Sequence, residues 1–117
     1  MNEESLGEKT IGIIGGTGKE GKGLAYRWLK SGYRVIIGSR QAEKAKLAAE
    51  DLRERVGPQA AVRVTGMENA DAVSACDIAV LTVPFGAHSS TLAGLKSTLA
   101  GKILVDVTVP LLSLIHI

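Results

Sequence analysis

Five short aliphatic runs, separated by segments with helical periodicity, are the feature of this sequence that most constrains its fold. Runs of about four to eight aliphatic residues bounded by glycine or proline are typical of strands buried on both faces, and such strands build parallel sheets. The intervening segments carry apolar residues three and four positions apart, which predicts helices. The predicted strands occupy residues 10–15, 33–39, 61–66, 77–84 and 102–109, and the predicted helices occupy residues 18–31, 40–57, 69–76 and 89–100.

The alternation of strands and helices predicts an α/β fold of Rossmann type, a doubly wound parallel sheet of about five strands with helices on both faces. We expect the crossovers between its strands to be right-handed. Hydrophobic residues make up 45% of the 117-residue chain but aromatic residues only 3%, so the core must be aliphatic. The helical stripes supply part of this core: Leu24, Trp28 and Leu29 in the first helix, and Ala42, Ala45, Ala49, Leu52 and Val56 in the second.

Charge and cysteine content exclude several classes of function. Lysine and arginine number 14 against 12 aspartates and glutamates, so the net charge is +2 and the charges are interspersed. The basic stripe that nucleic-acid binding requires is not present in the sequence. The single cysteine, Cys76, excludes a disulfide within this chain and a cysteine-based metal cluster. We expect Cys76 to be a small apolar filler.

The first nine residues and the hydropathy of the chain indicate a compartment. Residues 1–9, "MNEESLGEK", are polar and acidic, the reverse of a secretory signal peptide, and we expect a disordered tail. No apolar run reaches the roughly 18 residues of a membrane span, because Asp106 and Pro110 interrupt the C-terminal stretch that comes closest. These features predict a cytoplasmic protein with neither a membrane nor a nucleic acid as partner.

A glycine-rich loop follows the first predicted strand and opens the first predicted helix. It reads "GTGKEG" at residues 16–21, a G-x-G-x-x-G pattern that is weak alone and stronger where it joins a strand to a helix. In such a loop Gly16 allows the tight turn out of the strand, and Gly18 lets the backbone approach a diphosphate. Gly21 lets the helix pack closely on the strand. The pattern therefore predicts a dinucleotide site.

The start of this helix is suited to a diphosphate, because free backbone N–H groups and the helix dipole place partial positive charge there. Lys19 and Glu20 depart from the apolar residues often found in such loops, and the Glu20 carboxylate would repel a diphosphate unless it points away. The alternative is a glycine-rich turn that binds no ligand. The strand–loop–helix context favours the ligand.

The end of the second predicted strand indicates which dinucleotide binds. NAD-binding units usually place an aspartate or glutamate there, about 20 residues beyond the glycine loop, to bind the ribose hydroxyls. This chain has "GSR" at residues 38–40 instead, with Lys44 one helical turn beyond Arg40. Ser39, Arg40 and Lys44 would attract a 2′-phosphate that a carboxylate would repel, which predicts NADP(H) rather than NAD(H). The alternative is that Arg40 and Lys44 only face water.

With both stretches placed, the chain resembles the N-terminal NADP-binding domain of the NADPH-dependent coenzyme F420 reductases, the F420H2:NADP oxidoreductases. The resemblance covers residues 10–110 and rests on "GGTG", on "GSR" followed by Lys44, and on "CDIAVLTVP". It implies that the cofactor is held by three groups of residues: Thr17, Gly18, Lys19 and Glu20 at the phosphates, Ser39, Arg40 and Lys44 at the 2′-phosphate, and Val83 and Pro84 along the path to the nicotinamide.

In that family hydride passes directly between coenzyme F420, the co-substrate, and the nicotinamide, so the resemblance implies no catalytic side chain and no metal. The sequence agrees, because it has neither a nucleophile–histidine–acid set nor metal-ligand spacing. His88 follows the fourth predicted strand, where a lone histidine is more often solvated than functional. Asp106 lies near the end of the fifth, and we assign it no role.

The family continues beyond Pro110 into a C-terminal domain that binds F420. Residues 112–117, "LSLIHI", are similar to the translation of a transposon-end sequencing adapter, and we expect them to be non-native. We therefore interpret residues 10–111 as the NADP-binding domain of a longer oxidoreductase that is a homo-oligomer. We expect this fragment alone to bind NADP(H) weakly and to be inactive.

Two other functions stay open. A similar domain occurs in metalloreductases that pass electrons from NADPH to a flavin and, more distantly, in pyrroline-5-carboxylate and imine reductases. An imine, a flavin or a metal ion is thus an alternative acceptor. The other function is a non-catalytic NADP-sensing module, which would use the same nucleotide site to regulate a partner.

Overall fold

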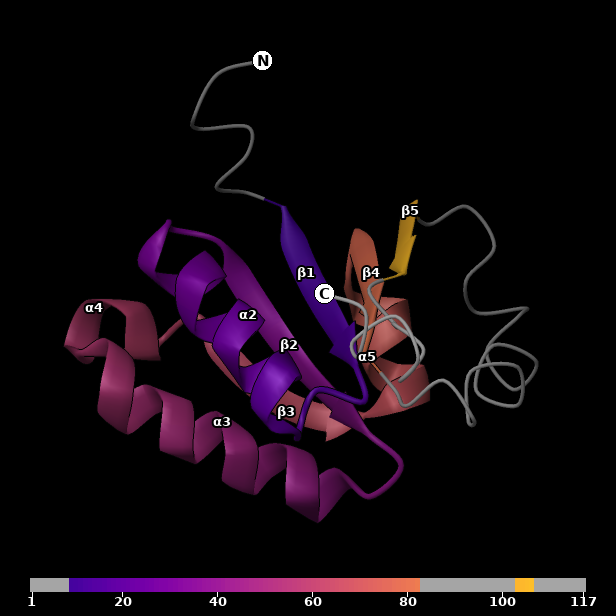
Figure 1. The fold of residues 1–117 in the computed structure, drawn as a ribbon, viewed down its shortest axis with the longest axis horizontal. Helices are drawn as coiled ribbons and strands as arrows, with labels where there is room; N and C mark the ends of the chain where they lie inside the picture. Colours follow the sequence, from indigo (N-terminus) through magenta and orange to yellow (C-terminus); the bar gives the residue numbers. More distant parts are fainter. Residues whose placement is uncertain (1–8, 83–102, 107–117) are drawn as a thin grey trace, which may run out of the picture.

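The computed structural model describes residues 9–82 and 103–106, in which five parallel strands form one sheet (Figure 1). The strands lie in the order β3-β2-β1-β4-β5. The central strand is β1, which pairs with β2 on one side and β4 on the other. The bounds are Thr10–Ile14 for β1, Arg34–Ser39 for β2, Val64–Glu68 for β3, Ile78–Leu81 for β4 and Ile103–Asp106 for β5.

Helices cover both faces of this sheet, so the predicted doubly wound fold is confirmed. Helices α2 (Lys19–Lys30) and α3 (Ala42–Val56) lie side by side on one face, whereas α5 (Asn69–Ala75) lies on the other (Figure 1). A short helix, α4 (Pro58–Ala61), follows α3. Within residues 9–82 and 103–106, none of these helices has the length and apolar character that crossing a membrane would take.

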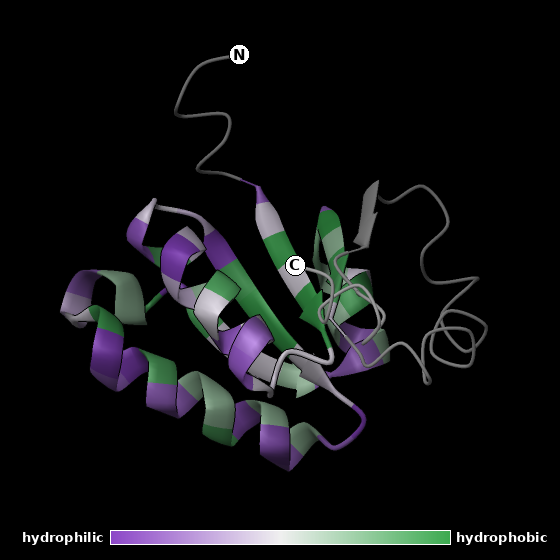
Figure 2. Ribbon diagram, viewed as in Figure 1, coloured by the Kyte–Doolittle hydropathy of each residue, from purple (hydrophilic) through white to green (hydrophobic). Residues whose placement is uncertain are grey.

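The core is aliphatic and the sheet divides it into two layers. Successive strand residues point to opposite faces. Ile13 and Ile37 therefore pack with α2 and α3, whereas Ile14 and Ile36 pack with α5. Figure 2 shows hydrophobic residues along the strands and hydrophilic residues on the outer side of α3. Burial of these two apolar layers against the sheet is what holds the helices in place.

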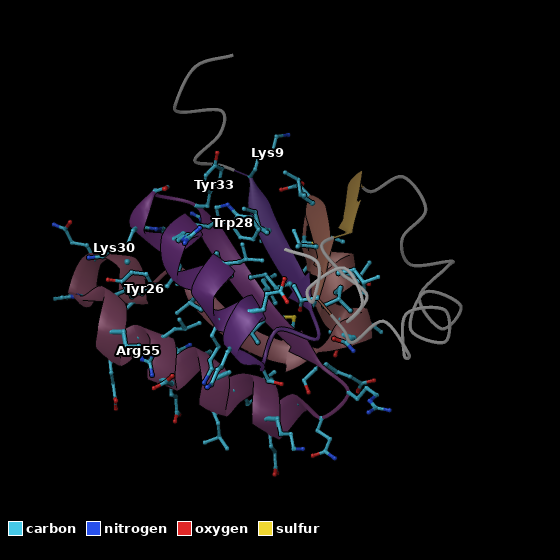
Figure 3. The ribbon with its side chains drawn as sticks, in the orientation of Figure 1. Lys9, Tyr26, Trp28, Lys30, Tyr33 and Arg55 are labelled. Atoms are coloured by element: carbon cyan, nitrogen blue, oxygen red, sulfur yellow. The ribbon has the colours of Figure 1, made fainter. Side chains whose placement is uncertain are left out.

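Most residues of the predicted helical stripes are buried, but Leu24, Trp28 and Ala42 are only partly buried. Leu29 in α2 and Leu52 in α3 are fully buried, as the spacing predicts. Trp28, predicted to be core, is only partly buried. Figure 3 places it with Tyr33 beside the start of β1, at the edge of the sheet opposite the glycine loop. The indole thus covers the rim of the core, where a large ring keeps one side toward solvent.

The third strand begins later than predicted. We predicted a strand at residues 61–66, but residues 58–61 form α4 and β3 runs from Val64 to Glu68. Gly57 adopts a φ of 87° and Pro58 occupies the first turn of α4. Proline is favourable there because the N–H that it lacks would have no helical partner. Val62 is 82% exposed, so the alternating pattern before β3 did not mark a buried strand face.

Several predicted features lie outside the described residues. They are the helix at residues 89–100 and the two tails, apart from Lys9. Strand β5 falls within the predicted range 102–109. Strand β4 falls within the predicted range 77–84, of which residues up to Thr82 are described.

The carboxyl ends of the strands meet at one edge, because every pairing in the sheet is parallel. From β1 the chain proceeds to β2 and β3 on one side, then returns to β4 and β5 on the other. In open α/β sheets, ligands bind at the carboxyl edge where the strand order reverses. We therefore expect the segments that follow β1, β2 and β4 to form the ligand site.

An ion-pair cluster joins α2 to α3. The Asp51 carboxylate lies 3.4 Å from the Lys22 ammonium of α2 and 3.3 Å from the Arg55 guanidinium one turn further along α3. The Asp51 side chain is 35% exposed, so solvent screens both pairs. The cluster therefore adds little stability at this helix–helix contact.

We expect Asp51→Asn to lower the free energy of unfolding by about 0.2–1 kcal/mol, which is the range for exposed ion pairs. Urea denaturation at low and high salt measures this change, which should shrink as salt screens the charges. Glu50→Gln, an exposed carboxylate at the neighbouring position, is the matched control. A loss several times larger, or one independent of salt, would contradict this estimate.

Candidate functional site

The turn after β1 depends on two adjacent glycines. Gly15 has a φ of 73°, a left-handed conformation that side chains other than glycine rarely adopt. We predicted that Gly16 allows the tight turn, but the structure assigns the left-handed conformation to Gly15. Gly16 is required for another reason, since a Cβ there would lie 2.9 Å from the Ile13 carbonyl oxygen. The turn is therefore compact, with no room for a side chain at its second residue.

Helix α2 begins directly after this turn and packs on it. A Cβ on Gly21 would lie 2.6 Å from the Gly16 Cα, which is closer than any real contact. The close packing predicted for Gly21 is thus made against the turn itself. The N-cap residue Gly18 is extended and no side chain caps the helix. The first-turn N–H groups consequently have no helical partner.

Gly18 is the open position of the loop. Apart from its two chain neighbours, no residue of the described part of the chain has an atom within 4 Å of the place where its Cβ would stand. Lys19 and Glu20 follow as exposed residues of the first turn, and Thr17 is half-buried. The Glu20 carboxylate makes no hydrogen bond or ion pair with residues 9–82. The space beside Gly18, where α2 begins, is therefore open, and the Glu20 carboxylate belongs to the same first turn.

The end of β2 carries the second group of predicted residues. Ser39 is buried, and its Oγ accepts a hydrogen bond of 3.2 Å from the Gln41 N–H. Arg40 and Lys44 are exposed. Helix α3 begins after Gln41 and no side chain caps it. Two cationic side chains and an uncapped helix N-terminus therefore share this corner, and all three favour an anion.

A carboxylate also lies at this edge, one strand away. Glu68 ends β3, is exposed, and is the register partner of Ser39. Sequence reasoning considered acids only at the end of β2 and did not single out Glu68. The end of β2 itself, residues 38–40, has no acid.

The two predicted groups meet through the backbone. The Gly16 N–H donates a hydrogen bond of 2.9 Å to the Gly38 carbonyl oxygen, which joins the glycine turn to the residue before Ser39. Parallel pairing of β1 with β2 brings the ends of both strands to the same level. The glycine loop and the Ser39–Arg40 corner are thus neighbouring parts of one surface.

Two further residues brace the turn, and sequence reasoning missed both. Asn69 is buried at the start of α5, and its Oδ1 accepts a hydrogen bond of 3.3 Å from the Gly15 N–H. Thr82 follows β4, and its hydroxyl and N–H donate to the Ile14 carbonyl oxygen at 2.8 and 3.0 Å. No local signal marked either contact, because Asn69 opens a predicted helix, Thr82 lies within a predicted strand, and their partners are more than 50 positions away in the chain. Val83 and Pro84, which follow Thr82, lie outside the described residues.

Cys76 is buried under the centre of β1. A Cβ on Gly12 would lie 2.9 Å from its Sγ, so glycine and cysteine fill one narrow space. The prediction that Cys76 is a buried filler is confirmed. In the part of the chain that the structure describes, no three His, Cys, Asp or Glu side chains are grouped to bind a metal ion.

A hollow of about 570 Å³ lies along the outer side of α2. Its lining includes Lys22, Tyr26 and Arg55, and among the predicted cofactor residues it includes Lys19. Figure 3 shows Tyr26 and Arg55 on neighbouring helices, away from the loop that follows β1. The hollow therefore extends from Lys19, in the first turn of α2, to Arg55 in the last turn of α3.

Comparison with known protein families shows to which family this chain is related. The family model described as NADP oxidoreductase, coenzyme F420-dependent, matches residues 10–110. The chain belongs to this family. The predicted resemblance is thereby confirmed, and the matched region contains both the glycine loop and the Ser39–Arg40 corner.

Several similar proteins have a curated name or a solved structure. They are compared with this member of the coenzyme F420-dependent NADP oxidoreductase family. An F420-dependent NADP reductase of Methanothermobacter thermautotrophicus is 47% identical over 101 residues, 86% of this chain and 43% of that protein. Metalloreductase STEAP3 of Rattus norvegicus is 36% identical over 100 residues, 86% of this chain and 18% of that protein. A structure from Arthrobacter sp. FB24, described as a proposed F420-dependent NADP reductase, is 30% identical with a TM-score of 0.63, covering 86% of this chain and 44% of that one.

The chain spans less than half the length of the curated F420-dependent NADP reductases that it matches. In each of them the matched part covers 43–45% of the protein. The family and the fold are therefore established for the matched part of this chain, which corresponds to less than half of each complete reductase.

Proposed function

We propose that this chain is the NADP(H)-binding domain of an oxidoreductase that transfers hydride between coenzyme F420 and NADP. The observation that carries the proposal is the Gly16–Gly38 hydrogen bond, which joins an open glycine loop to a β2 end that has a serine and an arginine where NAD-binding units have an acid. The names of the similar reductases support F420 as the co-substrate.

The glycine loop would bind the diphosphate through its backbone. N–H groups of the first turn of α2 have no helical partner, and the helix dipole adds partial positive charge. Gly18 leaves the approach clear, and Gly16 and Gly21 hold the helix start against the turn. We assign to this contact Gly16, Thr17, Gly18, Lys19, Glu20 and Gly21.

The corner after β2 would bind the 2′-phosphate. The Ser39 Oγ already accepts a hydrogen bond from Gln41, so its own hydrogen is free to be donated to a phosphate oxygen. Arg40 supplies a planar guanidinium for a charge-assisted contact, and Lys44 supplies a second positive charge. NADP(H) carries this phosphate and NAD(H) does not, which is the basis of the proposed selectivity.

Residues of this chain would position the cofactor and take no covalent part in the reaction. The nicotinamide and the deazaflavin, when bound, supply the hydride chemistry. Holding the two rings in contact distance and orientation contributes about 7–11 kcal/mol to the lowering of a barrier in well-aligned systems. We propose that Val83 and Pro84 line the path of the cofactor toward the nicotinamide. We propose no catalytic side chain and no metal.

We also propose that the complete protein has further residues that bind F420, because the matched part covers only 43–45% of each of the similar reductases. We further propose that residues 112–117, which lie beyond the family match at residues 10–110, are non-native. Resequencing the source DNA beyond Leu111 tests that origin. The complete protein is proposed to be a cytoplasmic homo-oligomer with small-molecule partners.

The binding experiment is a titration of this chain with NADPH and NADH, followed by nicotinamide fluorescence or calorimetry. A charge-assisted phosphate contact contributes about 1.5–3 kcal/mol, so we expect NADPH to bind about 10- to 150-fold more tightly. Equal affinities would refute the proposed cofactor. For the co-substrate, the complete enzyme should oxidise NADPH with F420, whereas this chain alone should not.

The similarity to a metalloreductase supports a second candidate function. In this second function, the same NADP(H) site belongs to a reductase whose electron acceptor is a metal ion, a flavin or an imine. The binding titration would give the same result, but the complete enzyme would oxidise NADPH with that acceptor and not with F420. NADPH binding without turnover on any acceptor would indicate a sensing module instead.

Glu20 supplies a prediction at this site. Because its carboxylate lies in the first turn of α2, Glu20→Gln should raise the affinity for NADP⁺ about two- to fivefold by removing repulsion of the diphosphate. The same change should lower the free energy of unfolding by about 0.3–1 kcal/mol, since an acid favours a helix N-terminus. Calorimetric titration and urea denaturation measure the two effects. Asp71→Asn, which removes an exposed acid from the first turn of α5, should reproduce the stability loss without the gain in NADP⁺ affinity.

A further inference from the structure

Asn69 is a buried polar side chain at the carboxyl edge of the sheet, and the proposed cofactor contacts do not use it. The residue is 8% exposed and opens α5, directly after β3. Its Oδ1 accepts a hydrogen bond of 3.3 Å from the N–H of Gly15. The two residues are 54 positions apart in the chain, so this contact forms only when α5 is packed on the sheet beside the end of β1.

The Asn69 amide oxygen also lies against the end of β2. A Cβ on Gly38 would stand 2.8 Å from Asn69 Oδ1, so the glycine leaves the space that this oxygen occupies. The carbonyl oxygen of the same Gly38 accepts the hydrogen bond from Gly16. The Asn69 side chain is therefore wedged between the glycine turn and the strand that leads to Ser39.

Gly15 is the residue whose orientation decides where the loop points. Its φ of 73° belongs to a region that glycine visits freely, so the turn has alternative conformations unless something holds it. The hydrogen bond from its N–H to Asn69 is a side-chain contact that restrains this residue. A restrained turn presents the following N–H groups in a fixed direction, which lowers the entropy cost of binding an anion.

We propose that Asn69 is a positioning residue of the NADP(H) site: it holds the Gly15 turn in the conformation that directs the loop N–H groups at the diphosphate. The inference rests on the proposed function of this chain. It distinguishes two parts of the site, because the Asn69 side chain hydrogen-bonds to the Gly15 turn, whereas in the described part of the chain it makes no hydrogen bond to Ser39, Arg40 or Lys44.

The experiment compares NADP⁺ with 2′-AMP, which carries the 2′-phosphate but no diphosphate. Asn69→Ala should weaken NADP⁺ binding by this chain about tenfold and change 2′-AMP binding by less than about twofold, since preorganisation is lost only at the loop. Asp71→Ala, an exposed residue of the same helix, is the control and should change neither affinity. Equal losses for the two ligands, or an unchanged NADP⁺ affinity, would overturn the proposal.

A second variant applies if Asn69→Ala does not fold. Asn69→Leu keeps a side chain of similar size in this buried space but has no acceptor for the Gly15 N–H. It should therefore weaken NADP⁺ binding about tenfold and change 2′-AMP binding by less than about twofold. An unchanged NADP⁺ affinity in this variant would also overturn the proposal. A wild-type chain that binds 2′-AMP and NADP⁺ equally well would show that the loop contributes no binding, whereas one that binds neither would refute the proposed function.

Discussion

Arg40→Ala should lower the affinity for NADP⁺ about 10- to 150-fold and leave the affinity for NAD⁺ within about twofold. A charge-assisted hydrogen bond between a guanidinium and a phosphate contributes about 1.5–3 kcal/mol, and each 1.4 kcal/mol is tenfold in affinity. NAD⁺ has no 2′-phosphate, so removing the guanidinium costs it nothing at this position. Calorimetric titration with both nucleotides measures the two changes, and the preference for NADP⁺ should largely disappear.

Arg34→Ala is the matched control for this experiment. Arg34 is also an exposed arginine of β2, but it begins the strand and so lies at the opposite edge of the sheet. The two variants have the same net charge, so a general electrostatic effect would lower NADP⁺ affinity equally in both. Equal losses would show that Arg40 does not contact the phosphate. The slope of affinity against salt should also fall in Arg40→Ala and not in the control.

Gly21→Ala should destabilise the fold by about 1–3 kcal/mol and weaken NADP⁺ binding at least tenfold. A Cβ at this position would lie 2.6 Å from the Gly16 Cα and 2.8 Å from its carbonyl oxygen, and backbone atoms cannot move aside as a flexible side chain can. Helix α2 must therefore separate from the turn, which is the kind of strain that overpacking causes. Urea denaturation and NADP⁺ titration measure the two effects.

Gly23→Ala makes the same substitution two residues later in the same helix. Apart from its two neighbours and the backbone of its own helix, no described atom lies within 4 Å of its Cβ position, and the residue is exposed. Alanine is a better helix former than glycine, so this variant should be more stable than the wild type by about 0.5–1 kcal/mol. The expected changes in the free energy of unfolding thus have opposite signs in the two variants. A Gly21→Ala protein as stable as the Gly23→Ala protein would contradict the packing of α2 on the turn.

Much of the fold was predictable from local patterns. Aliphatic runs placed the buried strands, and Gly57 marked the end of α3 correctly. The errors arose where a pattern had two physical causes. Alternation near Ala61 indicated a strand, but Pro58 started a helical turn first. Trp28 has helical spacing with core residues, but its place at the end of α2 leaves it at the rim.

The candidate site also has some features that local sequence patterns predict and others that they do not. The residues that would bind the cofactor were recognisable because glycine, serine and arginine occur at the ends of two strands, and these signals are local. Asn69 was not recognisable, because its partner Gly15 belongs to another part of the chain. The sequence made no prediction of which glycine is left-handed, since a run of two glycines does not say which of them takes the positive φ that the structure has at Gly15.

Residue spacing and turn chemistry act over a few neighbouring positions, and they sufficed for the strand–helix alternation, the glycine loop and the basic end of β2. The order of the strands, the Gly16–Gly38 hydrogen bond and the Asn69 contact depend on segments far apart in the chain. Such contacts are selected by how whole layers pack together and by which backbone groups this packing leaves in need of a partner. A sequence pattern does not contain that information locally, so these features became visible only when the sheet was assembled.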